Sequence, residues 1–72
     1  EGRLPAYCRT YDISSREQEI LRLLIEGRTN REIADTLFIS TNTVKTHVQN
    51  IYRKTGVTNR IRLIHTVNIQ QS

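Results

Sequence analysis

The sequence predicts an all-α fold, a compact bundle of four helices over about residues 15–26, 30–37, 41–54 and 60–69. Apolar residues recur every three or four positions in these segments, which places them along one side of a helix. Residues that cap helix N-termini precede the segments, and glycines follow two of them. The β-branched residues fall at helical intervals rather than in alternation, so strands have little support.

The first predicted helix covers about residues 15–26. The segment Ser14-Ser15-Arg16-Glu17 has the pattern of a capping box, in which the Ser14 side chain accepts from the backbone amide of Glu17 and the Glu17 carboxylate reaches back. Gly27 then offers the left-handed conformation that ends many helices. The apolar residues at helical spacing in between are Ile20, Leu21, Leu24 and Ile25.

The second and third predicted helices, at about residues 30–37 and 41–54, follow each other closely. Thr29-Asn30-Arg31-Glu32 is another capping box, Ser40 is a favourable N-cap for the third helix, and Gly56 closes that helix. Only about three residues lie between the two helices. So short a connection forces the helices to cross steeply, which is the geometry of a helix-turn-helix.

The fourth predicted helix covers about residues 60–69, with Thr58 or Asn59 as its cap. Its expected apolar side consists of Ile61, Ile64 and Val67. This helix completes the bundle that the other three begin.

Residues 1–12 show neither a helical nor a strand period and include Gly2 and Pro5. They are predicted to form an N-terminal tail or linker, and residues 13–72 the helix-turn-helix domain. Tyr7 and Tyr11 are expected to dock on the core of that domain.

The composition excludes several classes of protein. No apolar run approaches the ~20 residues that span a bilayer, and no secretory signal is evident, so we expect a cytoplasmic protein without a membrane partner. Cys8 is the only cysteine, and His47 and His65 give no zinc-ligand spacing, so no disulfide, metal or other cofactor is expected. The chain has no nucleophile and base at a plausible spacing and no glycine-rich phosphate loop, which argues against an enzyme.

The charge is distributed unevenly along the chain. The formal net charge is +4, and all seven acidic residues lie at or before Asp35. Such an asymmetry suits a phosphate backbone, although a solvated helix face or a site for anionic membranes has the same signature. The charged side chains from residue 40 onward are all cationic, namely Lys45, Arg53, Lys54, Arg60 and Arg62.

The third helix has two chemically different sides on a helical wheel. The side expected to face the core carries Val44, His47, Val48 and Ile51. The opposite side carries Asn42, Lys45, Thr46, Gln49, Tyr52 and Arg53, a set of donors and acceptors without negative charge. An α-helix fits the major groove of B-form DNA, where Lys pairs with guanine, Gln pairs with adenine and a Thr methyl meets a thymine methyl. We therefore predict Lys45, Thr46 and Gln49 as base-reading residues, against the alternative of an ordinary solvated face.

Several motifs resemble the LuxR/FixJ-type (GerE-like) helix-turn-helix DNA-binding domain of bacterial transcription regulators. The similarity runs without gaps from about Ile13 to Val67. The motifs that carry it are Ser14-Ser15-Arg16-Glu17-Gln18-Glu19-Ile20-Leu21, Gly27-Arg28-Thr29-Asn30-Arg31-Glu32-Ile33-Ala34, Ile39-Ser40, Thr43-Val44-Lys45-Thr46-His47, Asn50-Ile51 and Lys54-Thr55-Gly56-Val57. The resemblance implies a four-helix domain whose third helix enters the major groove and whose fourth helix supports a dimer contact.

The resemblance also implies roles for single residues and partners. Lys45, Thr46 and Gln49 occupy the family's base-reading positions. The expected partners are double-stranded DNA, a second copy bound through helix 60–69, and RNA polymerase, with the chain acting as the output domain of a response regulator. The residues expected to contact phosphate are Asn30, Arg31, Asn42, Thr43, Arg53 and Lys54.

The sequence departs from the family pattern in two places. Thr55 stands where leucine is frequent, and the fourth helix is bulkier than usual, so Ile61 or Leu63 forms either the dimer face or part of the core. His47 matches a frequent histidine, and its wheel position favours a packing residue at the core edge over a DNA ligand or pH sensor.

Two other functions fit the same fold. One is a helical bundle that binds a protein partner, which would need apolar anchors on the third helix where the sequence has Lys, Gln, Asn and Thr. The other is a sigma-factor-like DNA-binding region that also contacts RNA polymerase.

Overall fold

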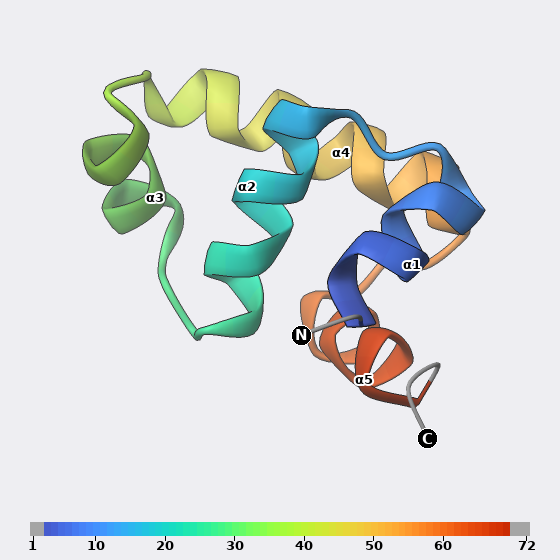
Figure 1. The fold of residues 1–72 in the computed structure, drawn as a ribbon. Coiled ribbons are helices and arrows are strands. Elements are labelled where there is room, and N and C mark those ends of the chain that lie inside the picture. Colours follow the sequence, from blue (N-terminus) through green and yellow to red (C-terminus); the bar gives the residue numbers. More distant parts are fainter. Residues whose placement is uncertain (1–2, 70–72) are drawn as a thin grey trace.

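The computed structural model describes the backbone of residues 3–69 and the side chains of residues 6–67. This part of the chain contains five helices and no strand (Figure 1). The four predicted helices are confirmed, with two of their ends shifted by one residue, and a fifth helix precedes them. Their bounds are α1 Arg3–Tyr11, α2 Ser15–Ile25, α3 Asn30–Leu37, α4 Thr41–Thr55 and α5 Arg60–Ile69.

The helices α2, α3 and α4 begin where the capping residues predict. In the first capping box, Ser14 Oγ accepts from Glu17 N at 3.2 Å and Glu17 Oε1 accepts from Ser14 N at 3.0 Å. The box of Thr29 and Glu32 has the same two bonds, at 3.1 and 2.9 Å. Ser40 Oγ accepts from Thr43 N at 3.0 Å. These bonds satisfy amides that have no partner inside the helix, so each start is determined locally.

Asn59, rather than Thr58, caps the N-terminus of α5. Its Oδ1 accepts from the amides of Ile61 at 2.8 Å and Arg62 at 3.2 Å. The preceding helix, α4, is closed by its C-cap Gly56, which adopts a φ of 74° and donates its N–H to Tyr52 O at 2.8 Å. A glycine takes this left-handed conformation at no steric cost.

The tight turn between α3 and α4 covers residues 38–40, as predicted. Phe38 takes the left-handed conformation there, with φ 59° and ψ 44°, and Ile39 N donates back to Ala34 O at 3.0 Å. Because the chain changes direction within three residues after α3, the buried Ile33 and Ala34 of α3 belong to the same core cluster as Val44 of α4. The two helices cross in the helix-turn-helix arrangement at one end of the molecule (Figure 1).

Residues 3–11 form α1, where the sequence predicts a tail or linker without regular structure. Within this helix Tyr7 and Cys8 are buried, and the rings of Tyr7 and Tyr11 lie 4.7 Å apart between centroids. The expected docking of Tyr7 and Tyr11 on the core is confirmed. The helix is short, and its contacts with α2 and α5 explain its stability better than any local signal.

The apolar side of α5 differs from the one predicted. Leu63 is completely buried and Val67 nearly so, whereas Ile61 is 77% exposed. The expectation that Ile61 faces the core is therefore wrong, and Leu63 takes that place. The reason is tertiary, because α1 packs beside α5 and its buried side chains belong to the same cluster as Leu63 and Val67 (Figure 1).

Candidate nucleic-acid interface

The two sides of α4 have the burial that the wheel predicts. Val44 and Ile51 are completely buried and Val48 nearly so. These side chains anchor α4 against α2 and α3, so the orientation of the opposite side is determined by the core.

The exposed side of α4 carries a continuous row of polar side chains. The row consists of Asn42, Lys45, Thr46, Gln49 and Arg53, all of them exposed. Thr46 Oγ1 donates to Asn42 O at 3.1 Å, which commits the hydroxyl proton to the helix. Lys45 forms no ion pair with any residue that the structure describes. We call these five residues the α4 polar row.

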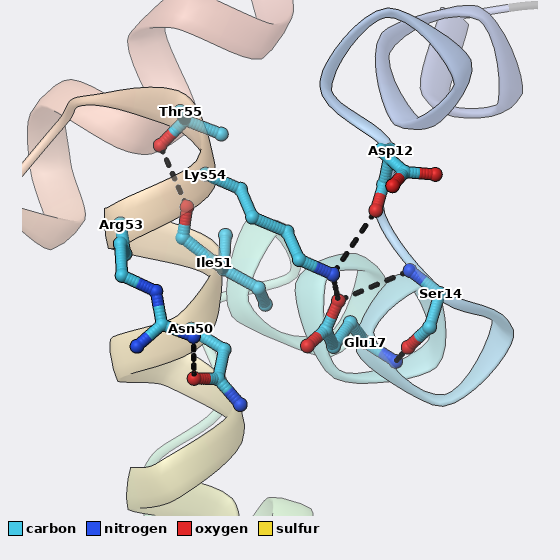
Figure 2. Close-up of polar contacts among 8 residues, drawn as sticks. All are labelled: Asp12, Ser14, Glu17, Asn50, Ile51, Arg53, Lys54 and Thr55. Carbon is cyan, nitrogen blue, oxygen red and sulfur yellow. Dashed lines mark hydrogen bonds and ion pairs between the residues drawn. The ribbon is translucent and has the colours of Figure 1, made fainter.

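The side chain of Arg53 is held along the surface of α4. Its Nη2 donates to Asn50 Oδ1 at 2.8 Å, one turn toward the N-terminus (Figure 2). The bond uses one of the five N–H donors of the guanidinium, and the residue as a whole is exposed.

The predicted phosphate-contacting residues do not all lie on an open surface. Arg31, Asn42, Thr43 and Arg53 are exposed. Asn30, by contrast, is half-buried, and its Oδ1 accepts from Arg60 Nη2 at 2.7 Å. Arg60 Nη1 also donates to Arg28 O at 3.5 Å, so it ties the start of α5 to the start of α3. No local sequence pattern predicts the hydrogen bond between Asn30 and Arg60, because the two residues lie 30 positions apart.

Among the residues predicted to contact phosphate, Lys54 departs most from the prediction, because its ammonium group is bonded inside the domain. Its Nζ donates to Glu17 Oε1 at 2.7 Å and to Asp12 O at 3.0 Å. Figure 2 shows the ammonium group between these two partners, with Arg53 and Asn50 away from them. Two of the three ammonium donors are thus used inside the domain, and a phosphate contact by Lys54 stays a prediction for the remaining one.

Glu17 combines two structural roles in one carboxylate. Its Oε1 accepts both from the Lys54 ammonium and from the Ser14 amide. Burial by itself raises the pKa of Glu17, but the Lys54 ammonium and the hydrogen bonds from Ser14 outweigh it and hold the pKa below its ordinary value. The capping box is evident in the sequence, but the ion pair with α4 joins residues 37 positions apart and has no local signal.

Two further residues of α4 lie at the border of its buried side. His47 is half-buried, as expected of a residue at the core edge, and its buried Nδ1 has no hydrogen-bond partner among the described residues. Tyr52, predicted to point outward, is half-buried and packs against the core. That prediction is corrected, because the core against which α4 packs reaches beyond Val48 to the neighbouring position of Tyr52, one turn later.

The described residues offer little other chemistry. They contain no group of three or more His, Cys, Asp or Glu side chains able to hold a metal ion. No helix in the described part of the chain is long and apolar enough to cross a membrane. Burial raises the pKa of the Cys8 thiol, and Glu17 adds to the effect, so the thiolate is disfavoured.

Comparison with known proteins agrees with this geometry. Residues 12–67 match the family described as "Bacterial regulatory proteins, luxR family". The chain is 48% identical over 56 residues to the "CsgBAC operon transcriptional regulatory protein" of Escherichia coli, covering 78% of the chain and 26% of that protein. The same figures hold for the "Probable csgAB operon transcriptional regulatory protein" of Salmonella typhimurium.

A third relative comes from Bacillus subtilis. The chain is 52% identical over 48 residues to its "Transcriptional regulatory protein LiaR", covering 67% of the chain and 23% of that protein. The chain spans about a quarter of the length of the curated relatives that it matches. With the match over residues 12–67, the chain belongs to the luxR family of bacterial regulatory proteins.

Proposed function

We propose that this chain binds specific sequences of double-stranded DNA as the output domain of a bacterial transcription regulator. The observation that carries the proposal is the α4 polar row, exposed and free of carboxylates on a helix whose opposite side is buried. A helix presented in this way fits the major groove, where base edges offer donors, acceptors and the thymine methyl group. Family membership supports the same function.

Three residues of the row are suited to reading bases. Lys45 donates to guanine O6 and N7, and Gln49 pairs with adenine. Thr46 offers its methyl group to a thymine methyl, since its hydroxyl donates to Asn42 O. Each lies in the first two-thirds of α4, and the N-terminal part of a recognition helix is the part that approaches the bases.

Phosphate contacts come from the exposed members of the predicted set. Arg31, Asn42, Thr43 and Arg53 are the residues that we assign to this role. The side-chain oxygen of Asn30 accepts from Arg60, so only its amide NH₂ group is left to donate to a phosphate. Such contacts set the register of the protein on the duplex and make its affinity depend on salt.

A second copy of the chain completes the proposed complex. Among the described side chains of α5, Ile61 is the large apolar one that is strongly exposed, and its 77% exposure makes it a suitable centre for a contact between two copies. Two copies related by a twofold axis would place their α4 helices on half-sites about one helical turn apart. The site itself would then be pseudo-palindromic.

The whole regulator extends the proposal beyond this domain. The matched segment makes up only about a quarter of its relatives' length, which leaves room in such a protein for a sensory or receiver domain. We propose that the connection to such a domain enters through residues 1–12, whose helix α1 itself packs on the core of this one. We also propose that the protein works in the cytoplasm and that it contacts RNA polymerase. The alternative of a protein-binding bundle is not favoured, because the α4 polar row has no apolar anchor.

Selection from a random DNA library tests the function. We expect the bound fragments to share a pseudo-palindromic sequence and footprinting to protect two half-sites about one turn apart. The logarithm of the binding constant should fall with the logarithm of the salt concentration by roughly 0.9 per phosphate contacted. Recovery of unrelated sequences, bound no more tightly than the starting library, would disprove sequence-specific recognition.

A further inference from the structure

Phe38, in the turn between α3 and α4, combines two unusual properties. Its side chain is 93% exposed, and its backbone is left-handed, with φ 59°. Left-handed backbone is sterically disfavoured for a bulky residue, and the ring leaves its apolar surface in water. At Gly27 and Gly56 the same chain uses glycine for this conformation. The left-handed backbone makes Phe38 the C-cap of α3 and so serves the turn, whereas the exposed ring adds almost nothing to the core, so a role outside the domain better explains the ring.

The position of Phe38 relates it to the proposed DNA-binding surface. It lies two residues before Ser40, the N-cap of α4, and next in the chain come the exposed Asn42 and Thr43. The N-terminal part of a recognition helix lies closest to the base edges. A residue just ahead of it therefore lies beside the sugar–phosphate strand that borders the groove.

The surroundings of Phe38 argue for DNA rather than a protein partner. The next residue, Ile39, is half-buried in the core, and the first turn of α4 exposes only polar side chains. A protein-binding patch needs contiguous apolar surface, which an isolated ring does not provide. Among the described side chains, the other large apolar residue that is strongly exposed is Ile61, which follows the opposite end of α4 in the chain, and the 15 residues of α4 span about 22 Å.

We propose that Phe38 is an uncharged contact to the sugar–phosphate backbone at the edge of the groove that α4 enters. The ring covers the C–H surface of a deoxyribose, so the affinity gained comes from apolar burial and not from charge. Such a contact releases no counterion and reads no base, so it adds affinity equally at every salt concentration and for every sequence. This inference rests on the proposed DNA-binding function.

The test compares Phe38→Gly and Phe38→Asn with the wild-type chain on a duplex obtained from the library. Both replacements suit the left-handed conformation, so we expect melting temperatures no lower than that of the wild type. We expect DNA affinity, measured by fluorescence anisotropy, to fall about fivefold to tenfold, as for the loss of roughly half a ring face of burial. The slope of affinity against salt should stay unchanged, whether the duplex is specific or random.

Control variants separate this inference from the proposed function. Phe38→Leu keeps an apolar side chain and should retain more affinity than Phe38→Gly. If the wild type and Lys45→Ala bind the selected duplex and a random duplex alike, the proposed function itself fails. If the wild type discriminates but Phe38→Gly binds as tightly, only the role of Phe38 is overturned. The backbone contact is also overturned if Phe38→Gly loses affinity only for duplexes that carry one particular base pair. A salt slope that differs between Phe38→Gly and the wild type would overturn it as well.

Discussion

Lys45 and Arg53 lie on the same exposed side of α4 but are held differently. The Arg53 guanidinium is tied to Asn50, whereas Lys45 forms no ion pair with any described residue. An exposed lysine without an ion pair, in the first half of a recognition helix, suits a single base contact, and an arginine bonded to its own helix suits the backbone. The two residues should therefore contribute to DNA binding in distinguishable ways.

We predict that Lys45→Ala relaxes base preference at one position of the site and costs about 1–3 kcal/mol of binding free energy. Arg53→Ala should weaken binding to all sequences alike and lower the salt slope by about 1. Titrations against the selected site and its single-base variants, at several salt concentrations, measure both effects. Arg22→Ala removes an exposed charge from α2 and should keep the base preference. Unchanged affinity in both α4 variants would show that the assigned side is wrong.

Phe38 and Asn59 show how residue-scale conformations arise. Asn59 caps α5 through bonds to amides two and three residues ahead, a local pattern that the sequence offered together with the Thr58 alternative. The left-handed Phe38 was not foreseen, because the sequence marks such positions only when they hold glycine or asparagine. Its conformation follows from the short turn that α3 and α4 impose.

At the scale of the elements, Glu17 links α2 to α4. Its carboxylate closes the capping box of α2 and receives the ammonium of Lys54, whose other donor bond reaches Asp12 O at the end of α1. The Glu17 side chain is 6% exposed and that of Lys54 29%, so the pair is only partly screened by water. This contact joins three helices at one point.

We predict that Glu17→Gln lowers the free energy of unfolding at pH 7 by about 1–3 kcal/mol, because glutamine keeps the capping pattern but loses the charge. Glu19→Gln is the matched control, since the pair of Glu19 with Arg16 is exposed and should contribute at most about 0.5 kcal/mol. Urea unfolding of both variants measures the difference. Equal effects of the two substitutions would contradict the role given to Glu17.

The same pair predicts a pH dependence. Because the folded pKa of Glu17 lies below its ordinary value, its stabilisation is complete above the unfolded pKa of about 4.3 and is lost as the pH falls through the folded pKa. The difference in stability between the wild type and Glu17→Gln should therefore shrink as the pH is lowered from 5 toward 2. A difference that stays constant over this range would show that charge is not its source.

At the scale of the whole molecule, α1 completes the core. Tyr7 is fully buried and clusters with residues of α2, α4 and α5. Its hydroxyl is buried and completes no hydrogen bond within the described residues, although Thr55 is near enough to lower its pKa slightly. Burial, with a smaller effect of Tyr11, outweighs Thr55 and raises the pKa of Tyr7 to about 12.

We predict that Tyr7→Ala destabilises the domain by about 3–5 kcal/mol, whereas Tyr7→Phe changes stability by less than about 1 kcal/mol at pH 7. The raised pKa means that the stability contributed by the neutral hydroxyl is present below pH 10 and is lost as the pH rises toward 12. Tyr7→Phe should therefore gain on the wild type in thermal melts at pH 11. Tyr7→Ala melting like the wild type would show that α1 does not stabilise the core.

Ile61 provides a prediction about assembly. Ile61→Gln should leave the unfolding free energy of the single domain within about 0.5 kcal/mol, because the side chain is 77% exposed. It should weaken binding to a two-half-site duplex about tenfold through lost apolar burial between copies, while binding to one half-site stays the same. Gel-shift titrations with both duplexes measure the ratio. An unchanged ratio would exclude Ile61 from the dimer contact.

The sequence by itself determined the start of each helix from α2 to α5, the tight turn and the two sides of α4. These features depend on bonds between residues two to four apart or on one helix's own period, so they are readable in any short window. The family resemblance added the assignment of α4 as the recognition helix, and the match over residues 12–67 confirms the family.

Only the tertiary structure decided which residues those helices meet. In the packed structure α1 is part of the core, and in α5 Leu63 rather than Ile61 is buried. Tyr52 packs against the core, and Lys54 pairs with Glu17, 37 positions away. The physical reason is common to all four. Each depends on burial or on an ion pair between elements distant in the chain, and such energies exist only after the helices have packed.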